Sequence, residues 1–108
     1  MSAYRPSIII LSGTARGMEL ALDQPRVTMG RGPGVDLCFD DPAMSREHAA
    51  IEFACGRFQI RRLGAASELV VNGGEASCVE LKSEDRFRLG GHSFQFKLEE
   101  RRAPLLSQ

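Results

Sequence analysis

The 108-residue sequence contains no tryptophan, a single tyrosine and only three cysteines. Cys38, Cys55 and Cys78 are widely spaced and odd in number, which does not suit a disulfide framework. Together with the two histidines, they show no spacing typical of a zinc site. We therefore predict reduced, mostly buried thiols, as is usual in the cytoplasm, and neither a metal site nor a cofactor.

An excess of charge and long apolar runs are absent as well. The 14 basic residues balance 14 acidic ones, which argues against a general nucleic-acid binder. The apolar run at residues 8–11 has the length of a strand, and the N-terminus lacks the pattern of a signal peptide. We expect a cytoplasmic protein that binds neither nucleic acid nor a membrane.

The feature that the sequence does show is period-two alternation of apolar and polar residues, with no competing helical period. The alternating or apolar runs are residues 7–12, 18–22, 27–29, 37–39, 50–53, 58–61, 86–89 and 94–98. Turns rich in glycine separate these runs, and Asn72-Gly73 suits a tight hairpin turn. The pattern predicts an all-β sandwich of about ten or eleven mostly antiparallel strands within one domain, residues 1–100. The alternation then ends, so residues 101–108 are expected to form a frayed tail.

Two short motifs stand near these runs. Gly30-Arg31 directly follows the run at residues 27–29, and Ser-Arg-Glu-His at residues 45–48 comes after the run at residues 37–39. The alternation of strands and loops predicts that Arg31 and Ser45 lie at neighbouring loop tips. A fixed guanidinium beside a hydroxyl and backbone N–H groups is a good receptor for phosphate. Taken alone, however, Arg31 is more typical of a surface arginine in an ion pair, and Ser45 of a loop serine bonded to its own backbone.

Ser45 and His48 also have the residue types of a nucleophile and its base. No third orienting group and no G-x-S-x-G turn accompany them. We therefore predict no catalytic residue and no enzymatic activity.

The order and spacing of the two motifs resemble those of the forkhead-associated (FHA) family, over roughly residues 8–98. The resemblance implies an FHA-like sandwich that recognises a phosphothreonine on a partner protein, and hence a Ser/Thr kinase upstream. It implies that Arg31, Ser45 and Arg46 bind the phosphate. For Arg46, an exposed charge on a strand edge is an equally good interpretation. Structural support of the site would come from Gly30, His48, Asn72 and Gly73.

The second half of the family's pattern differs here. The family usually carries Asp-Leu-Gly-Ser-Thr-Asn-Gly-Thr, for which this chain has Arg-Leu-Gly-Ala-Ala-Ser-Glu-Leu at residues 62–69. Ala66 replaces a threonine that helps at the phosphate, and Glu68 brings a carboxylate near an anion site. Ser67 replaces the asparagine that holds the ligand backbone, so we expect a weakened contact there. The alternative function is a phosphate-independent interaction or assembly module with a degenerate phosphopeptide site.

Overall fold

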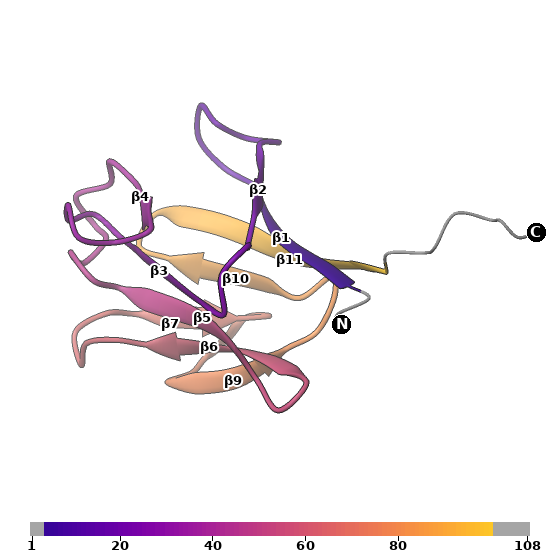
Figure 1. The fold of residues 1–108 in the computed structure, drawn as a ribbon. Coiled ribbons are helices and arrows are strands. Elements are labelled where there is room, and N and C mark those ends of the chain that lie inside the picture. Colours follow the sequence, from indigo (N-terminus) through magenta and orange to yellow (C-terminus); the bar gives the residue numbers. More distant parts are fainter. Residues whose placement is uncertain (1–3, 101–108) are drawn as a thin grey trace, which may run out of the picture.

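A computed structural model describes residues 4–100 and shows two β-sheets packed face to face (Figure 1). The strands are β1 (Tyr4–Ile10), β2 (Glu19–Ala21), β3 (Arg26–Gly30), β4 (Leu37–Cys38), β5 (Ala49–Ala54), β6 (Arg57–Arg62), β7 (Leu69–Val71), β8 (Gly74–Glu75), β9 (Cys78–Leu81), β10 (Arg86–Leu89) and β11 (His92–Glu100). These eleven strands confirm the predicted all-β sandwich. The predicted frayed tail, residues 101–108, lies outside the described residues.

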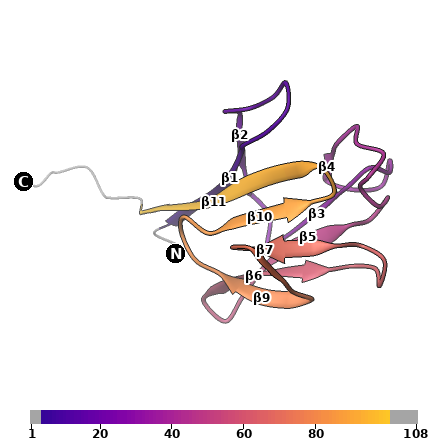
Figure 2. The same cartoon turned by 180° about the vertical axis from the view of Figure 1, so that it is seen from behind.

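The first sheet has the strand order β2-β1-β11-β10-β7-β8, and the second has the order β4-β3-β5-β6-β9 (Figures 1 and 2). Every pairing is antiparallel except that of β3 with β4. Within residues 4–100 there is no helix long and apolar enough to cross a membrane.

The core lies between the two sheets, because alternate residues of each strand point inward. Phe94 and Phe96 of β11 are fully buried, and Ile8 of β1 and Ile60 of β6 face the same interior. The ring of Phe94 stacks on that of Phe87, with centroids 5.2 Å apart. Full burial of each such side chain contributes about 1.5–3 kcal/mol to the stability of the fold. The alternating apolar residues that the sequence shows are therefore the main source of the packing between the sheets.

The Asn72-Gly73 turn forms as predicted between β7 and β8. Asn72 has φ 49° and Gly73 has φ 86°, which are the positive values that a tight hairpin requires. The Asn72 side chain also joins this turn to β10, since it donates to Asp85 Oδ1 (3.0 Å) and accepts from the Arg86 N–H (2.9 Å).

The prediction of mostly buried cysteines is wrong, because all three side chains are exposed. Cys38 lies on the edge strand β4, where Leu37 takes the inward position. Cys55, with φ 55°, forms the turn between β5 and β6, and Cys78 begins the edge strand β9. Edge strands and turns leave a side chain in solvent whatever its polarity.

The connections β3–β4, β4–β5 and β6–β7 gather at one end of the sandwich, together with the β10–β11 turn (Figure 1). The start of β1 and the end of β11 lie at the opposite end, where Tyr4 pairs with Glu100 (Figure 1). The two ends are therefore built from different parts of the chain.

Candidate functional site

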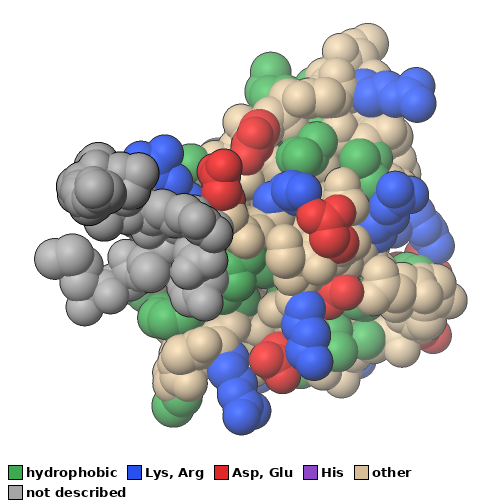
Figure 3. Space-filling view, turned by 90° about the vertical axis from the view of Figure 1, so that its right-hand side faces the viewer, with side chains coloured by type: hydrophobic (Ala, Val, Ile, Leu, Met, Phe, Trp, Pro, Cys, Tyr) green, Lys and Arg blue, Asp and Glu red, His purple; other side chains and the backbone are tan. Residues whose placement is uncertain are grey.

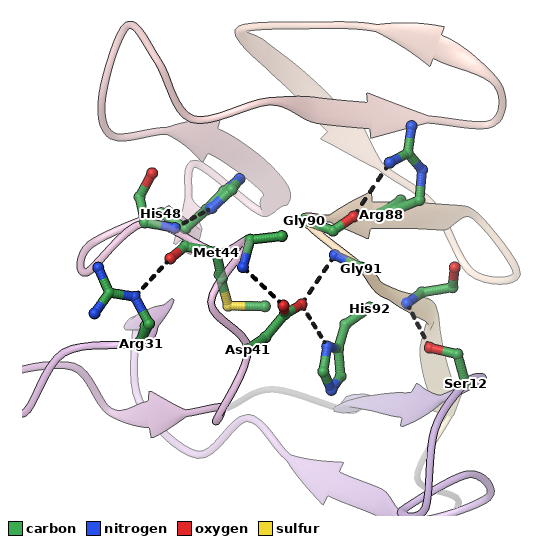
Figure 4. Close-up of polar contacts among 12 residues, drawn as sticks. Ser12, Arg31, Asp41, Met44, His48, Arg88, Gly90, Gly91 and His92 are labelled. Atoms are coloured by element: carbon green, nitrogen blue, oxygen red, sulfur yellow. Dashed lines mark hydrogen bonds and ion pairs between the residues drawn. The ribbon is translucent and has the colours of Figure 1, made fainter.

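Arg31 follows β3 and is held by the β4–β5 loop. Its backbone N–H donates to the carbonyl of Ser45 (2.9 Å), and the N–H of Gly32 donates to the carbonyl of Arg46 (3.0 Å). The side chain is fixed as well, because Nε donates to the carbonyl of Met44 (3.0 Å; Figure 4). Its two terminal nitrogens make no hydrogen bond to any residue that the structure describes, and the side chain is exposed. This arginine is therefore held in one orientation with donors left over.

Gly30 explains why a glycine precedes this arginine. A Cβ atom at Gly30 would overlap the carbonyl oxygen of Arg46, so any other residue would push the two loops apart. Gly32 is less restricted but still tight, since a Cβ there would lie 3.0 Å from Cβ of Arg46. The close approach of the two backbones sets the position from which the Arg31 side chain projects.

His48 connects three segments at this end of the sandwich, and its side chain is only 1% exposed. Nδ1 accepts the backbone N–H of Ser45 (2.9 Å), which leaves the proton on Nε2. Nε2 then donates to the carbonyl of Glu68 in the β6–β7 loop (2.6 Å). The backbone of His48 also bonds to Met29 of β3 and to Leu63. The buried ring thus joins the β4–β5 and β6–β7 loops from within.

Ser67, predicted to make a weakened contact with a ligand backbone, is buried in the structure. It is 2% exposed and packs close to Gly64. Its hydroxyl donates to Oγ of Ser45 (2.7 Å). Because Ser67 supplies the proton of this bond, the proton of the Ser45 hydroxyl remains available for another acceptor. Ser67 is therefore a hydrogen-bond partner of Ser45 in the structure.

Arg46 is exposed beside the β3–β4 loop. With Pro33, Gly34 and Glu47 it lines a groove of about 440 Å³ next to Arg31 in sequence and space. Charges of both signs line this groove, which suits a polar segment of a partner better than a bare anion. Glu68 points its carboxylate toward Arg88 of β10, 3.6 Å away, and this exposed ion pair partly offsets the negative charge near the site.

The β4–β5 loop is tied down at its other side by Asp41, a residue that the sequence pattern did not single out (Figure 4). Its side chain accepts the N–H of Ala43 (2.9 Å), the N–H of Gly91 (2.9 Å) and Nδ1 of His92 (2.8 Å). The bond from His92 and those from the two backbone N–H groups lower the pKa of the Asp41 carboxyl. The loop that carries Ser45 is thereby attached to the β10–β11 turn.

The structure brings four of the predicted residues, Arg31, Ser45, His48 and Ser67, into one bonded cluster. Gly30 and Arg46 adjoin this cluster through the paired loop backbones. Asn72 and Gly73 do not belong to this cluster. Their turn bonds to Arg86 at the start of β10, whereas the β10–β11 turn, which bonds to Asp41, lies at the other end of that strand. No group of three or more His, Cys, Asp or Glu side chains suited to a metal occurs in the described part of the chain.

Comparison with curated proteins shows similarity to a protein named as a regulator. The glycogen accumulation regulator GarA of Mycolicibacterium smegmatis is 30% identical over 83 residues, which are 77% of this chain and 52% of GarA. The chain thus spans about half the length of the curated relatives that it matches.

Solved structures share the fold. The FHA domain of the CT664 protein from Chlamydia trachomatis is 26% identical with a TM-score of 0.77, and the match covers 86% of this chain and 96% of that domain. EmbR of Mycobacterium tuberculosis, solved in complex with a low-affinity phosphopeptide, has a TM-score of 0.79 at 23% identity over 92% of this chain and 26% of EmbR.

A family model described as inner membrane component of T3SS, cytoplasmic domain, matches residues 9–100, which is almost the whole of the described sandwich. The chain therefore belongs to this family, and its fold and paired motifs make it a domain of the FHA type.

Proposed function

We propose that this domain is an interaction module that binds a phosphothreonine segment of a partner protein at the Arg31 end of the sandwich. The observation that carries the proposal is the state of Arg31: its Nε is bound to the Met44 carbonyl, and its terminal nitrogens face solvent. A guanidinium held in this way gives a phosphate two parallel donors at little further cost in side-chain entropy.

Ser45 supplies a further donor of suitable geometry. Its hydroxyl oxygen accepts from Ser67, so its own proton can bond to a phosphate oxygen. Arg46, exposed on the rim, adds positive charge. The relatives support the assignment, because EmbR was solved with a phosphopeptide. The partner is then a substrate of a Ser/Thr kinase, and we place the domain in the cytoplasm, in accord with the family's description.

The same bonds argue that the domain performs no catalysis of its own. A serine nucleophile needs a base to take its proton. His48 cannot take the Ser45 proton, because Nδ1 accepts the Ser45 backbone N–H and Nε2 donates to Glu68. The serine and histidine therefore act as a ligand donor and a structural brace.

A second candidate function rests on Ser67. Its side chain is buried and bonded to Ser45, so we expect it not to make the contact with a ligand backbone that the family makes through an asparagine. A sandwich without that contact suits a phosphate-independent assembly module, which would bind its partner through a sheet face or an edge strand.

A binding assay with degenerate peptide pools separates the two candidates. We expect the pool with a central phosphothreonine to bind, and the unphosphorylated pool to bind far less. Hydrogen bonds to a charged group contribute about 1.5–3 kcal/mol each, so Arg31→Ala should weaken binding by about 100-fold. Arg57→Ala is the matched control, since Arg57 is also an exposed arginine and begins β6, away from the Arg31 loops. Equal binding of both pools, or of the Arg31→Ala and parent proteins, would favour the assembly module.

A further inference from the structure

Two arginines of β10 project from the outer face of the first sheet. The burial pattern of β10 alternates, with Phe87 and Leu89 in the core. Arg86 and Arg88 therefore point outward, where both are exposed and lie about 7 Å apart along the strand. The Arg86 side chain makes no hydrogen bond or ion pair with any residue that the structure describes. Arg88 engages one nitrogen, Nη1, which donates to the carbonyl of Gly90 (3.1 Å). Most donors of the two guanidinium groups are thus available to a ligand.

A groove of about 520 Å³, the arginine groove, lies between these side chains and the neighbouring strands. Its lining also includes the apolar Leu11 and Val70 and the polar Asn72 and Ser93. Among the described residues that line it, only the two arginines carry a charge. The end of the sandwich where β1 begins and β11 ends differs, because Lys and Arg side chains are mixed there with Asp and Glu (Figure 3). The groove is thus positive on a chain that has no net charge.

Two acidic side chains lie near the arginine groove but do not line it. Glu68 is 3.6 Å from Nη1 of Arg88, and Glu75 of the edge strand β8 pairs with Val70. Both glutamates are exposed. An ion pair in solvent contributes little to stability, so a carboxylate of a ligand can replace Glu68 at Arg88 at small cost.

The arginine groove begins at the end of the sandwich that carries the phosphate site. Arg88 bonds to the β10–β11 turn at this end (Figure 4), and Glu68 beside it belongs to the β6–β7 loop that His48 holds. From there the lining follows β10 to the Asn72-Gly73 turn. A peptide whose phosphothreonine lies at Arg31 can therefore continue past the β6–β7 loop into the groove.

We propose that the arginine groove binds an acidic stretch of the phosphorylated partner, with Asp or Glu carboxylates at Arg86 and Arg88. The proposal rests on the proposed phosphothreonine function and extends it to the sequence beside the phosphate. The planar fork of a guanidinium matches a carboxylate, and a lining of one sign selects a ligand of the other. Leu11 and Val70 can cover the aliphatic part of the acidic side chains. Nucleic acid suits the groove less well, because its lining offers no exposed aromatic ring for base stacking.

The test measures binding of peptide pools to the 108-residue chain at low ionic strength. Each pool has a central phosphothreonine, and its flanks are rich in Asp and Glu, in Ser and Ala, or in Lys. We expect the acidic pool to bind about 3- to 10-fold more tightly than the neutral Ser/Ala pool, because two exposed ion pairs each add a small gain. The difference should shrink in about 0.5 M salt, which screens such pairs.

Three double variants, each checked for folding by thermal melting, connect this preference to the groove. Arg86→Gln with Arg88→Gln should abolish the preference for the acidic pool and leave binding of the neutral pool unchanged. Arg16→Gln with Arg57→Gln is the matched control, since it removes the same charge from two exposed arginines that do not line the groove. Arg86→Glu with Arg88→Glu should reverse the preference towards the lysine pool, which a loss of structure would not do.

An acidic pool that binds no better than the neutral one would overturn the proposal and leave the phosphothreonine function intact. Equal loss of the preference in the control variant would also overturn it, because the effect would then come from net charge alone. Displacement of the acidic pool by a single-stranded oligonucleotide at lower concentration would mean that the groove binds nucleic acid. If an unphosphorylated acidic pool binds as tightly as the phosphorylated one, and only the groove variants lose it, the groove is confirmed and the phosphate site is refuted.

Discussion

Ser67→Ala tests the most specific claim about the phosphate site, namely that one buried hydroxyl orients another. The substitution removes only the donor to Oγ of Ser45, 2.7 Å away, and it leaves a side chain of nearly the same size at a position that is 2% exposed. Ser45 keeps its backbone bond to His48, so the loop itself should stay in place.

The structure sets the expected magnitudes. A neutral buried hydrogen bond contributes about 0.5–1.5 kcal/mol, which corresponds to a fall of about 2–12 °C in melting temperature. The bond from Ser45 to a phosphate is charge-assisted and larger, so Ser45→Ala should weaken phosphopeptide binding by about 10- to 100-fold. Ser67→Ala only releases the Ser45 hydroxyl from its fixed orientation, and we expect a loss of about 3- to 10-fold.

A double-mutant cycle on phosphothreonine-peptide binding isolates this coupling. Calorimetric titrations would compare the parent, the two single variants and the double variant, under conditions where all four are folded. Ser67→Ala should weaken binding in the parent but have almost no effect once Ser45 is alanine. The reasoning is refuted if Ser67→Ala weakens binding by the same factor in both backgrounds.

Two further substitutions test the supports of the site. His48→Ala should lower the free energy of unfolding by at least about 2 kcal/mol in urea, because it leaves the Ser45 N–H and the Glu68 carbonyl without their buried partner; an unchanged stability with lost binding would mean that His48 contacts the ligand. Asp41→Asn should cost about 1–2 kcal/mol at neutral pH, since an amide cannot accept all three bonds. The lowered pKa of Asp41 means that its contribution is fully present above the ordinary carboxyl pKa of about 4 and is lost as the pH falls through the lowered pKa. The stabilities of parent and variant should therefore converge in acid, and a gap independent of pH would contradict this role.

The sandwich could be predicted because strands and turns leave their signals in residues that are close together in the sequence. Phe94 and Phe96 alternate with polar residues and are buried, and Asn72 with Gly73 takes the positive φ angles that its turn requires. The strand β9, at Cys78–Leu81, was not predicted, since four residues without flanking turn signals show too little alternation to stand out. Its place is set by pairing with β6, which local pattern does not reveal.

The site was predicted only in part, for the same reason. Gly30 and Arg31 are recognisable in sequence because they stand side by side in a short motif, in which the close loop contact leaves no room for a Cβ atom at Gly30. The direction of the Ser67 hydroxyl depends on what packs around it, so alignment with the family's asparagine did not predict its bond to Ser45. Asp41 and His92 are 51 residues apart, and no spacing rule connects them.

The bond between Asp41 and the β10–β11 turn affects when, during synthesis of the chain, the phosphate site is complete. The loop that presents Ser45 is held by Gly91 and His92, which are synthesised 50 and 51 residues after Asp41. Such distant pairings form late, because the entropy of closing a long loop must be overcome before they give any stabilisation. A nascent chain that has already exposed Gly30, Arg31 and Ser45 therefore still lacks a finished receptor, and recognition of a partner waits until translation has passed the last turn of the sandwich.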